Sequence, residues 1–172
     1  TINGTLDGTL TNRTDGIVLV DGSAATDAGT VGDDVTNSAT LTLDTANLDG
    51  GIDNNAPGTI LVQDGTTTVA GNVTNEGTIT VTSGELEIEG TSTLTNEAGM
   101  APFPGFVVVE NGGTLDVTTL INQSAGVSPN AGVTVTDQGV IEGDLDNQTS
   151  AWAVINTTTN TTGVDGDVTN AG

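Results

Sequence analysis

The sequence contains no cysteine, no histidine and no tyrosine, and Arg13 is its only basic side chain. Without cysteine there can be no disulfide framework, and nothing follows about the redox compartment. Catalysis by histidine, cysteine, lysine or tyrosine side chains is excluded, which leaves carboxylates as the main acid-base groups. We therefore expect no enzyme activity, no catalytic residues and no required cofactor.

Positive charge is nearly absent, so that the formal net charge at pH 7 is -22. Nucleic acids and anionic membranes attract proteins through lysine and arginine, because these side chains replace counterions at the phosphates. The sequence also has no apolar run near about 18 residues and no signal-peptide pattern. We expect no nucleic-acid partner, no insertion into a membrane, and a surface that is solvated or attracts divalent cations.

What the sequence does contain is 25 glycines, many threonines and asparagines, and short runs of valine, isoleucine and leucine. Aliphatic residues that recur at short, regular intervals argue against disorder despite the high charge. Such residues in short pieces are typical of strands. The length of 172 residues suits one domain that spans residues 1–172.

A motif of an aliphatic residue, any residue and an asparagine recurs eight times along the chain. Successive copies lie 17 to 26 residues apart, which indicates a repeat architecture. The asparagines that end the eight copies are Asn12, Asn37, Asn54, Asn75, Asn96, Asn122, Asn147 and Asn170. We expect them to occupy equivalent corners, where asparagine side chains can bond to the backbone or to one another as a ladder.

The segment 77–96 shows what one repeat contains. Its three runs, GTITV, GELEIEG and STLTN, alternate aliphatic with polar residues and are separated by turns. Three such strands make one triangular coil, and coils stacked about 4.8 Å apart pair each strand with its equivalents above and below. The sequence therefore predicts an all-β, single-chain parallel β-helix (β-solenoid) of about eight coils. We expect right-handed coiling, because parallel crossovers prefer it.

An acidic residue stands directly before a glycine in several repeats. Aligning the repeats on this glycine predicts that five carboxylates lie at one corner of different coils. The five are Asp7, Asp49, Glu89, Glu142 and Asp165. Oxygen ligands from neighbouring coils could bind Ca²⁺ and relieve the repulsion between them. These coils are not all adjacent, and a diffuse cloud of counterions is the alternative.

The two ends of the sequence are related. The last seven residues, GDVTNAG, nearly repeat residues 71–77, GNVTNEG, and appending the start of the chain to its end yields a seam that reads like residues 69–96. We therefore expect one unit of a longer solenoid, in which Gly172 is followed by Thr1 of the next copy through a tandem repeat or end-to-end stacking. The alternative is that an arbitrary fragment of a solenoid also ends within a coil.

Two segments, 97–106 and 150–163, interrupt the regular spacing and are predicted corner insertions. The first contains a candidate contact loop with Met100, Phe103 and Phe106. Such a loop could make a lateral contact or bind a ligand, or its aromatic side chains could fold back over the coil.

Threonine alternates with other residues in strings such as residues 78–82, TITVT. These strings resemble the threonine arrays of ice-binding β-solenoids. Flat arrays require uniform coils, however, and the unequal repeat lengths predict that the coils lose register. Threonine is also a good strand former, which is the simpler explanation.

The strings VTNEGTITV and LDGTLTN resemble the repeats of large secreted bacterial β-helix proteins of the filamentous haemagglutinin and autotransporter-passenger type. The likeness covers nearly the whole chain, but it is a pattern of glycine, asparagine, threonine and aliphatic residues that specifies the fold better than the function. The absence of lysine departs from the usual pattern. The resemblance implies an exported adhesin, fibre or surface scaffold, and hence an extracellular or cell-surface location in a prokaryote.

The expected function is that of a structural subunit of an extracellular filament or adhesin stalk. Its expected partners are further copies of itself, head to tail, with a surface glycan or another cell as further candidates. The alternative is a carbohydrate-binding or carbohydrate-hydrolysing β-helix that uses surface carboxylates such as Asp33 and Asp34, or Glu85, Glu87 and Glu89. Oligosaccharide binding, and loss of activity in Glu87→Gln, would discriminate between the two classes.

Overall fold

The structure, a computed structural model, describes residues 1–22, 28–98, 104–124, 132–156 and 163–171. Every regular element in these ranges is a β-strand, and no helix is present in them. Neighbouring strands pair in parallel and stack as a β-solenoid, which confirms the predicted fold class. The chain is therefore a β-helix repeat protein.

Twenty strands follow one another in the described parts of the chain. They are β1 (Thr5–Leu6), β2 (Leu10–Asn12), β3 (Ile17–Asp21), β4 (Gly29–Val31), β5 (Val35–Asn37), β6 (Thr40–Asp44), β7 (Ala46–Leu48), β8 (Ile52–Asn54), β9 (Thr59–Gln63), β10 (Thr66–Val69), β11 (Val73–Asn75), β12 (Thr78–Thr82), β13 (Glu85–Asn96), β14 (Phe106–Glu110), β15 (Thr114–Asn122), β16 (Val133–Thr136), β17 (Val140–Asn147), β18 (Ala153–Asn156), β19 (Val164–Asp165) and β20 (Val168–Asn170).

The strands form three faces. The first face is the seven-stranded sheet β3-β6-β9-β12-β14-β16-β18. The second face contains β1, β4, β7, β10 and β19, and the third contains β2, β5, β8, β11 and β20. The long strands β13, β15 and β17 cross the corner between them, so their first halves belong to the second face and their second halves to the third. These strands join both faces into one sheet.

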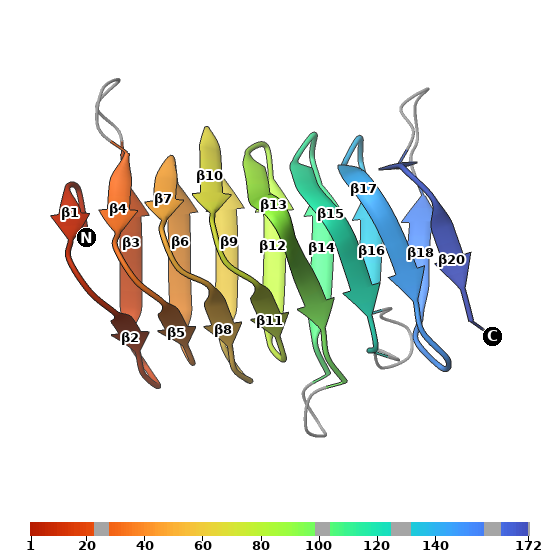
Figure 1. The fold of residues 1–172 in the computed structure, drawn as a ribbon, viewed down its shortest axis with the longest axis horizontal. Helices are drawn as coiled ribbons and strands as arrows, with labels where there is room; N and C mark the ends of the chain where they lie inside the picture. The colour runs from red at the N-terminus through yellow and green to blue at the C-terminus, as the bar shows by residue number, and fades with distance from the viewer. Residues whose placement is uncertain (23–27, 99–103, 125–131, 157–162, 172) are drawn as a thin grey trace.

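The coils are right-handed. In Figure 1 the near strands run downward and the far strands run upward while the chain advances from left to right. The first face has seven strands and is extended at its N-terminal end only by a single bridge between Ile2 and Val20. Full coils are therefore slightly fewer than the eight expected.

The core consists of aliphatic side chains stacked in columns. Strands of the first face such as β9, β12 and β14 alternate half-buried and buried residues, because successive side chains point to opposite faces of a strand. Val62, Val81 and Val109 are paired in adjacent coils and are 0% exposed. Burying one such side chain stabilises the fold by about 1.5 to 3 kcal/mol. The buried hydrophobic residues of this core are all valine, leucine, isoleucine or alanine within the described ranges.

The unequal repeat lengths do not disturb the register of the first face. Thr59, Thr78 and Phe106 begin three neighbouring strands, and each pairs with the next without a register shift. The prediction that the coils lose register is therefore wrong for this sheet. The length differences are taken up between the strands, where the segment that follows Asn96 is longer than the one that follows Asn75.

The predicted insertions lie partly outside the described residues. Met100 and Phe103 fall outside them, as does 157–162. Phe106 begins β14, where it is half-buried. Residues 153–156 form β18, the last strand of the first face. Among the residues that the structure describes, no helix is long and apolar enough to cross a membrane.

Thr67 is a defect in the core. Its side chain is 0% exposed, and its Oγ1 atom has no hydrogen-bond partner. An unsatisfied buried hydroxyl costs about 1 to 3 kcal/mol, so we expect Thr67→Val to raise the free energy of unfolding by about 1 kcal/mol. Denaturant unfolding measures this. Thr68→Val is the control, because the Thr68 Oγ1 donates to Asn47 Oδ1 at 2.7 Å. Equal stabilisation by both substitutions would contradict the explanation.

Candidate functional site

A single column of asparagines runs along the solenoid at the corner between the third and first faces. They end the third-face strands of successive coils and pair in register. In every step the Nδ2 atom of one asparagine donates to the Oδ1 atom of the next, over 2.7 to 3.0 Å. The structure thus places all eight asparagines identified in the sequence, from Asn12 to Asn170, in one hydrogen-bonded ladder.

The ladder also holds the turns that lead into the first face. Asn75 Nδ2 donates to the carbonyl oxygen of Gly77 at 3.2 Å and to that of Phe106 in the next coil at 3.0 Å. Asn75 and Asn96 are both 0% exposed. Burying a polar group costs free energy unless the group is hydrogen-bonded, so these bonds allow an asparagine to occupy a core position.

Glycines next to the ladder make room for it. A Cβ atom at Gly58 would lie 2.6 Å from Asn54 Oδ1, and one at Gly105 would lie 2.7 Å from Asn96 Oδ1. Both distances are far shorter than van der Waals contact. Glycine at these two positions therefore has a steric cause.

The ladder has a direction. All seven bonds between asparagines run from an Nδ2 atom to the Oδ1 atom of the asparagine that follows in the chain. Asn12 therefore begins the ladder with its Oδ1 acceptor, and Asn170 ends it with its Nδ2 donor. The two ends of the ladder are chemically complementary.

The last coil exposes apolar side chains of the core columns. Val168 pairs with Leu145 and Ile155 pairs with Val135, so both occupy inward positions. Val168 is 53% exposed and Ile155 is 43% exposed, whereas Leu145 and Val135 are almost completely buried. At the other end, Ile2 is only partly buried against the core. Each end of the solenoid thus exposes aliphatic side chains that belong to the core columns.

The five acidic residues predicted to bind calcium do not form one column. Asp7, Asp49 and Glu89 each follow a second-face residue of the same column, but Gly32 and Ala70 occupy that position in the coils between them. The remaining two, Glu142 and Asp165, pair with one another in the column of Glu87, two positions earlier in the strand than Glu89. In the described ranges, no three acidic side chains converge so as to hold a metal ion.

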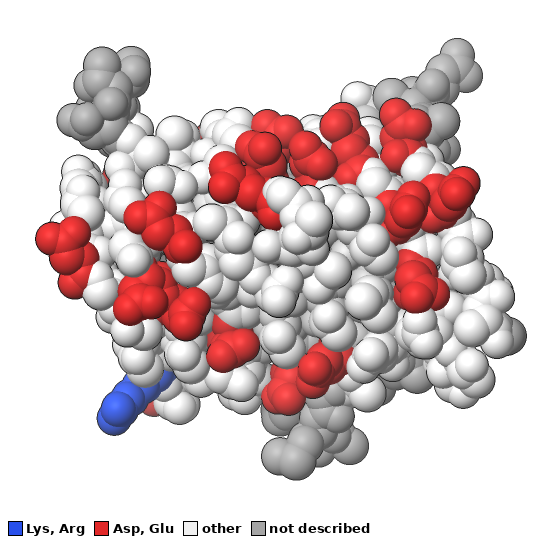
Figure 2. Space-filling view, in the orientation of Figure 1, with Lys and Arg blue, Asp and Glu red and all other residues white. Residues whose placement is uncertain are grey.

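A different acidic column lies on the second face. Glu87, Asp116, Glu142 and Asp165 occupy the same position in four successive coils. Figure 2 shows acidic side chains gathered over the upper ends of β13, β15 and β17. Partial burial raises the pKa of Glu87, and repulsion from Asp116 and from its strand neighbours raises it further. The sequence signal for this column is an acidic residue at the same strand position in successive repeats. Aligning the repeats on their glycines does not reveal it.

The raised pKa of Glu87 predicts a pH dependence of stability. Because the folded-state pKa lies above the ordinary value of 4.5, the native state binds more protons in the window between them. This contribution to stability is complete below the unfolded pKa and is lost as the pH rises through the folded pKa. We expect Glu87→Gln to raise the melting temperature at pH 7 and to have little effect below about pH 4.

Thermal unfolding at low salt between these pH values tests this expectation. Glu76→Gln, which removes the same charge from a turn outside the column, is the matched control. A gain at pH 7 that is equal in both variants would attribute the effect to net charge alone.

Two shallow grooves lie near the corners. One is lined by Asp34, Asp53 and Asn72 together with glycines. Asp34 Oδ1 accepts a hydrogen bond from the Gly51 backbone nitrogen at 2.8 Å, and Asn72 Oδ1 accepts one from Thr93 at 3.0 Å. These side chains therefore cap backbone groups of the next coil, where the chain turns between the second and third faces.

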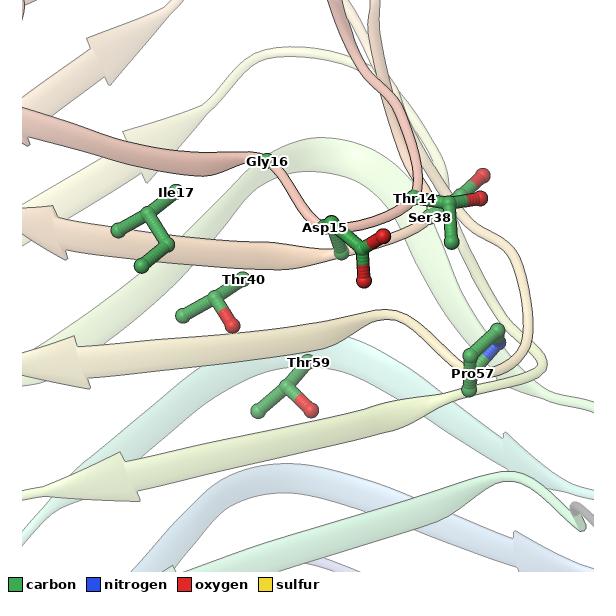
Figure 3. A pocket seen from close by; sticks show the side chains of 9 residues that line it. Thr14, Asp15, Gly16, Ile17, Ser38, Thr40, Pro57 and Thr59 are labelled. Carbon is green, nitrogen blue, oxygen red and sulfur yellow. The ribbon is translucent and has the colours of Figure 1, made fainter.

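The other groove lies beside the first face, where Figure 3 shows Ile17, Thr40 and Thr59 on successive strands. Asp15 is the one carboxylate among the described residues that line it. The paired carboxylates that glycoside hydrolysis requires are not assembled in this groove.

Comparison of the chain with protein-family models, with curated proteins and with solved structures returned no significant match.

Proposed function

We propose that this chain is a structural segment of an extracellular filament or adhesin stalk in a prokaryote. The stalk lengthens when the solenoid continues from the last coil of one copy into the first coil of the next. The resemblance of the repeats to those of secreted bacterial β-helix adhesins supports this proposal. Its partners are further copies of the chain, and a surface glycan or another cell is the proposed target of the stalk.

The exposed core at the ends is the observation that carries the proposal. Val168 and Ile155 continue columns that are buried in the interior coils, yet the two residues are 53% and 43% exposed. A further coil would bury both and would pair the backbone groups of β18 and β20. Solenoid repeats are stabilised by such nearest-neighbour interfaces, and open sheet edges are templates for another strand.

The direction of the ladder supports head-to-tail continuation. Asn170 offers an amide donor at one end, and Asn12 offers an acceptor at the other. A following copy placed in register would therefore add one bond identical to the seven within the chain. Continuation with the opposite polarity would bring two donors or two acceptors together, which is unfavourable for buried groups.

The composition also suits an extracellular fibre. The sequence offers a protease of trypsin specificity only Arg13. No specific observation favours the carbohydrate-hydrolysing alternative, which stays a prediction. Calcium is proposed only as an optional counterion for the acidic side chains of the second face.

Substitution at the last coil tests the proposal. We expect Val168→Asp to abolish end-to-end association of the purified chain, because it places a charge in the cross-section that the next coil must cover. Thr169→Asp is the control, since it adds the same charge at the outward position beside it. Electron microscopy of particle length measures the result. Equal rod lengths for the wild type and both variants under all conditions would contradict end-to-end association.

A further inference from the structure

The first face is almost free of charge in a chain whose net charge is -22. Its seven strands contain three acidic residues, Asp21, Asp44 and Glu110, and each is the last residue of its strand. All the charge of these strands therefore lies along one edge of the face. The outward positions away from this edge form what we term the uncharged field, which consists of Ile17, Leu19, Thr40, Thr42, Thr59, Leu61, Thr78, Thr80, Phe106, Val108, Thr134 and Val154.

The central column of the uncharged field alternates apolar residues with threonine. In successive coils it reads Leu19, Thr42, Leu61, Thr80, Val108, Thr134 and Val154. Leucine or valine thus recurs every second coil, about 10 Å apart, with a more polar threonine between them. Where the apolar residue is leucine, the threonine is also the smaller side chain. Ile17 and Val154, at opposite ends of the face, are 81% and 40% exposed.

We propose that the uncharged field is the surface through which two copies of this chain pack side by side, sheet against sheet. The alternating column is self-complementary. When two faces are offset by one coil, the leucines and valines of one copy lie over the threonines of the other. Sheets that pack in this way lie about 10 Å apart with their inner side chains interdigitated.

The charge distribution selects a second copy as the partner. The second face carries the acidic column that includes Glu87 and Asp116, and two such faces repel one another. The uncharged field is the surface of the described chain on which two copies can approach without opposing carboxylates. A basic partner would instead be attracted to the acidic column and would find no charged group in the field.

The size of the field predicts weak pairing of single units. It measures about 30 Å by 13 Å, or about 400 Å² per copy, which is below the roughly 800 Å² per partner of a standard interface. Pairing strengthens when several units are joined in one stalk, because each further contact is intramolecular. This lateral contact is separate from the end-to-end continuation proposed above and involves different residues.

Sedimentation equilibrium of the full chain tests the proposal. Every chain in the measurement carries Val168→Asp as a background substitution, so that end-to-end association does not contribute. We expect a monomer–dimer equilibrium that strengthens in about 1 M salt, where the screening length falls to about 3 Å. Thr80→Glu, at the centre of the field, should weaken the dimer at least about tenfold, because it places a charge in the contact.

Thr95→Glu is the matched control. Thr95 is an outward, half-buried threonine of the third face, and its substitution adds the same charge. We expect less than about a twofold change in dimer affinity, and circular dichroism establishes that both variants are folded. A monomer at all concentrations in high salt would overturn the proposal. Equal weakening of the dimer by Thr80→Glu and Thr95→Glu would also overturn it. So would a wild-type chain whose association is removed completely by Val168→Asp, because all association would then be end to end.

Discussion

Asn75→Ala should destabilise the solenoid by about 3 kcal/mol or more. The substitution removes the donor to Asn96 Oδ1 at 2.8 Å and two bonds to carbonyl oxygens, and it removes the acceptor of the bond from Asn54 at 2.7 Å. It leaves the Asn96 oxygen without its partner at a position that is 0% exposed. Chemical denaturation monitored by circular dichroism measures the loss.

Asn72→Ala is the control for this prediction. Asn72 lies three residues earlier, is exposed, and accepts one hydrogen bond from the Thr93 backbone nitrogen at 3.0 Å. We expect it to cost about 1 kcal/mol or less. If Asn75→Ala is no more destabilising than Asn72→Ala, the ladder does not hold the coils together.

Asn75→Asp distinguishes the contribution of hydrogen bonding to stability from the contribution of side-chain shape. The aspartate has the size of asparagine, but at neutral pH it places a buried negative charge against the Asn96 oxygen and the carbonyl of Phe106. Its folded-state pKa is therefore expected to lie above the unfolded value, so stability should be lost as the pH rises through the folded pKa. We expect partial recovery in acid, where the protonated carboxyl can donate.

Gly143→Ala is the second substitution with a large expected effect. Gly143 lies in β17 at the corner between the second and third faces, with a φ of +128°. A Cβ atom there would overlap the carbonyl oxygen of Val117 in the neighbouring coil. Backbone strain and the clash with backbone atoms together predict a loss of about 3 to 5 kcal/mol.

Gly90→Ala isolates the contribution of backbone strain. Gly90 lies at the corresponding corner of β13 with a φ of +67°, and a Cβ atom there would meet nothing within 4 Å. We expect a loss of about 1 kcal/mol. Thermal or denaturant unfolding of the two variants under identical conditions should show the difference. Equal losses would mean that the close contact with Val117 is relieved at no cost.

The asparagine ladder could be foreseen in the sequence because asparagine ends a strand in every repeat. A short strand has a fixed spacing of side chains, so Val73 and Leu94 must stack if Asn75 and Asn96 do. The alternation of aliphatic and polar residues likewise predicted which side chains enter the core. These features depend on spacing within one strand, which is constant.

The acidic column could not be predicted in the same way, because corners vary in length. The register between β13 and β15 shifts after Ile88, and that between β15 and β17 shifts after Asp116. Alignment on Gly90 and Gly143 therefore places Glu89 and Glu142 together, whereas strand pairing places Glu142 beside Asp116. A glycine in the sequence indicates where a corner lies, but not how many residues the corner contains.

The uncharged field could not be predicted from the sequence for a related reason. Its central column joins residues such as Leu61, Thr80 and Val108, which unequal numbers of residues separate in the sequence. Sequence spacing suggested lost register, although the variable segments lie outside the sheet. Only the paired strands reveal which side chains share a face.

The central claim is that the solenoid continues from one copy into the next. Cryo-electron microscopy of a tandem in which Gly172 is followed by Thr1 of a second copy tests it most directly. The account predicts one unbroken rod, with a coil across the junction and Asn170 bonded to Asn12 of the following copy. Two rods joined by a flexible junction, with Val168 still exposed in the first, would contradict it.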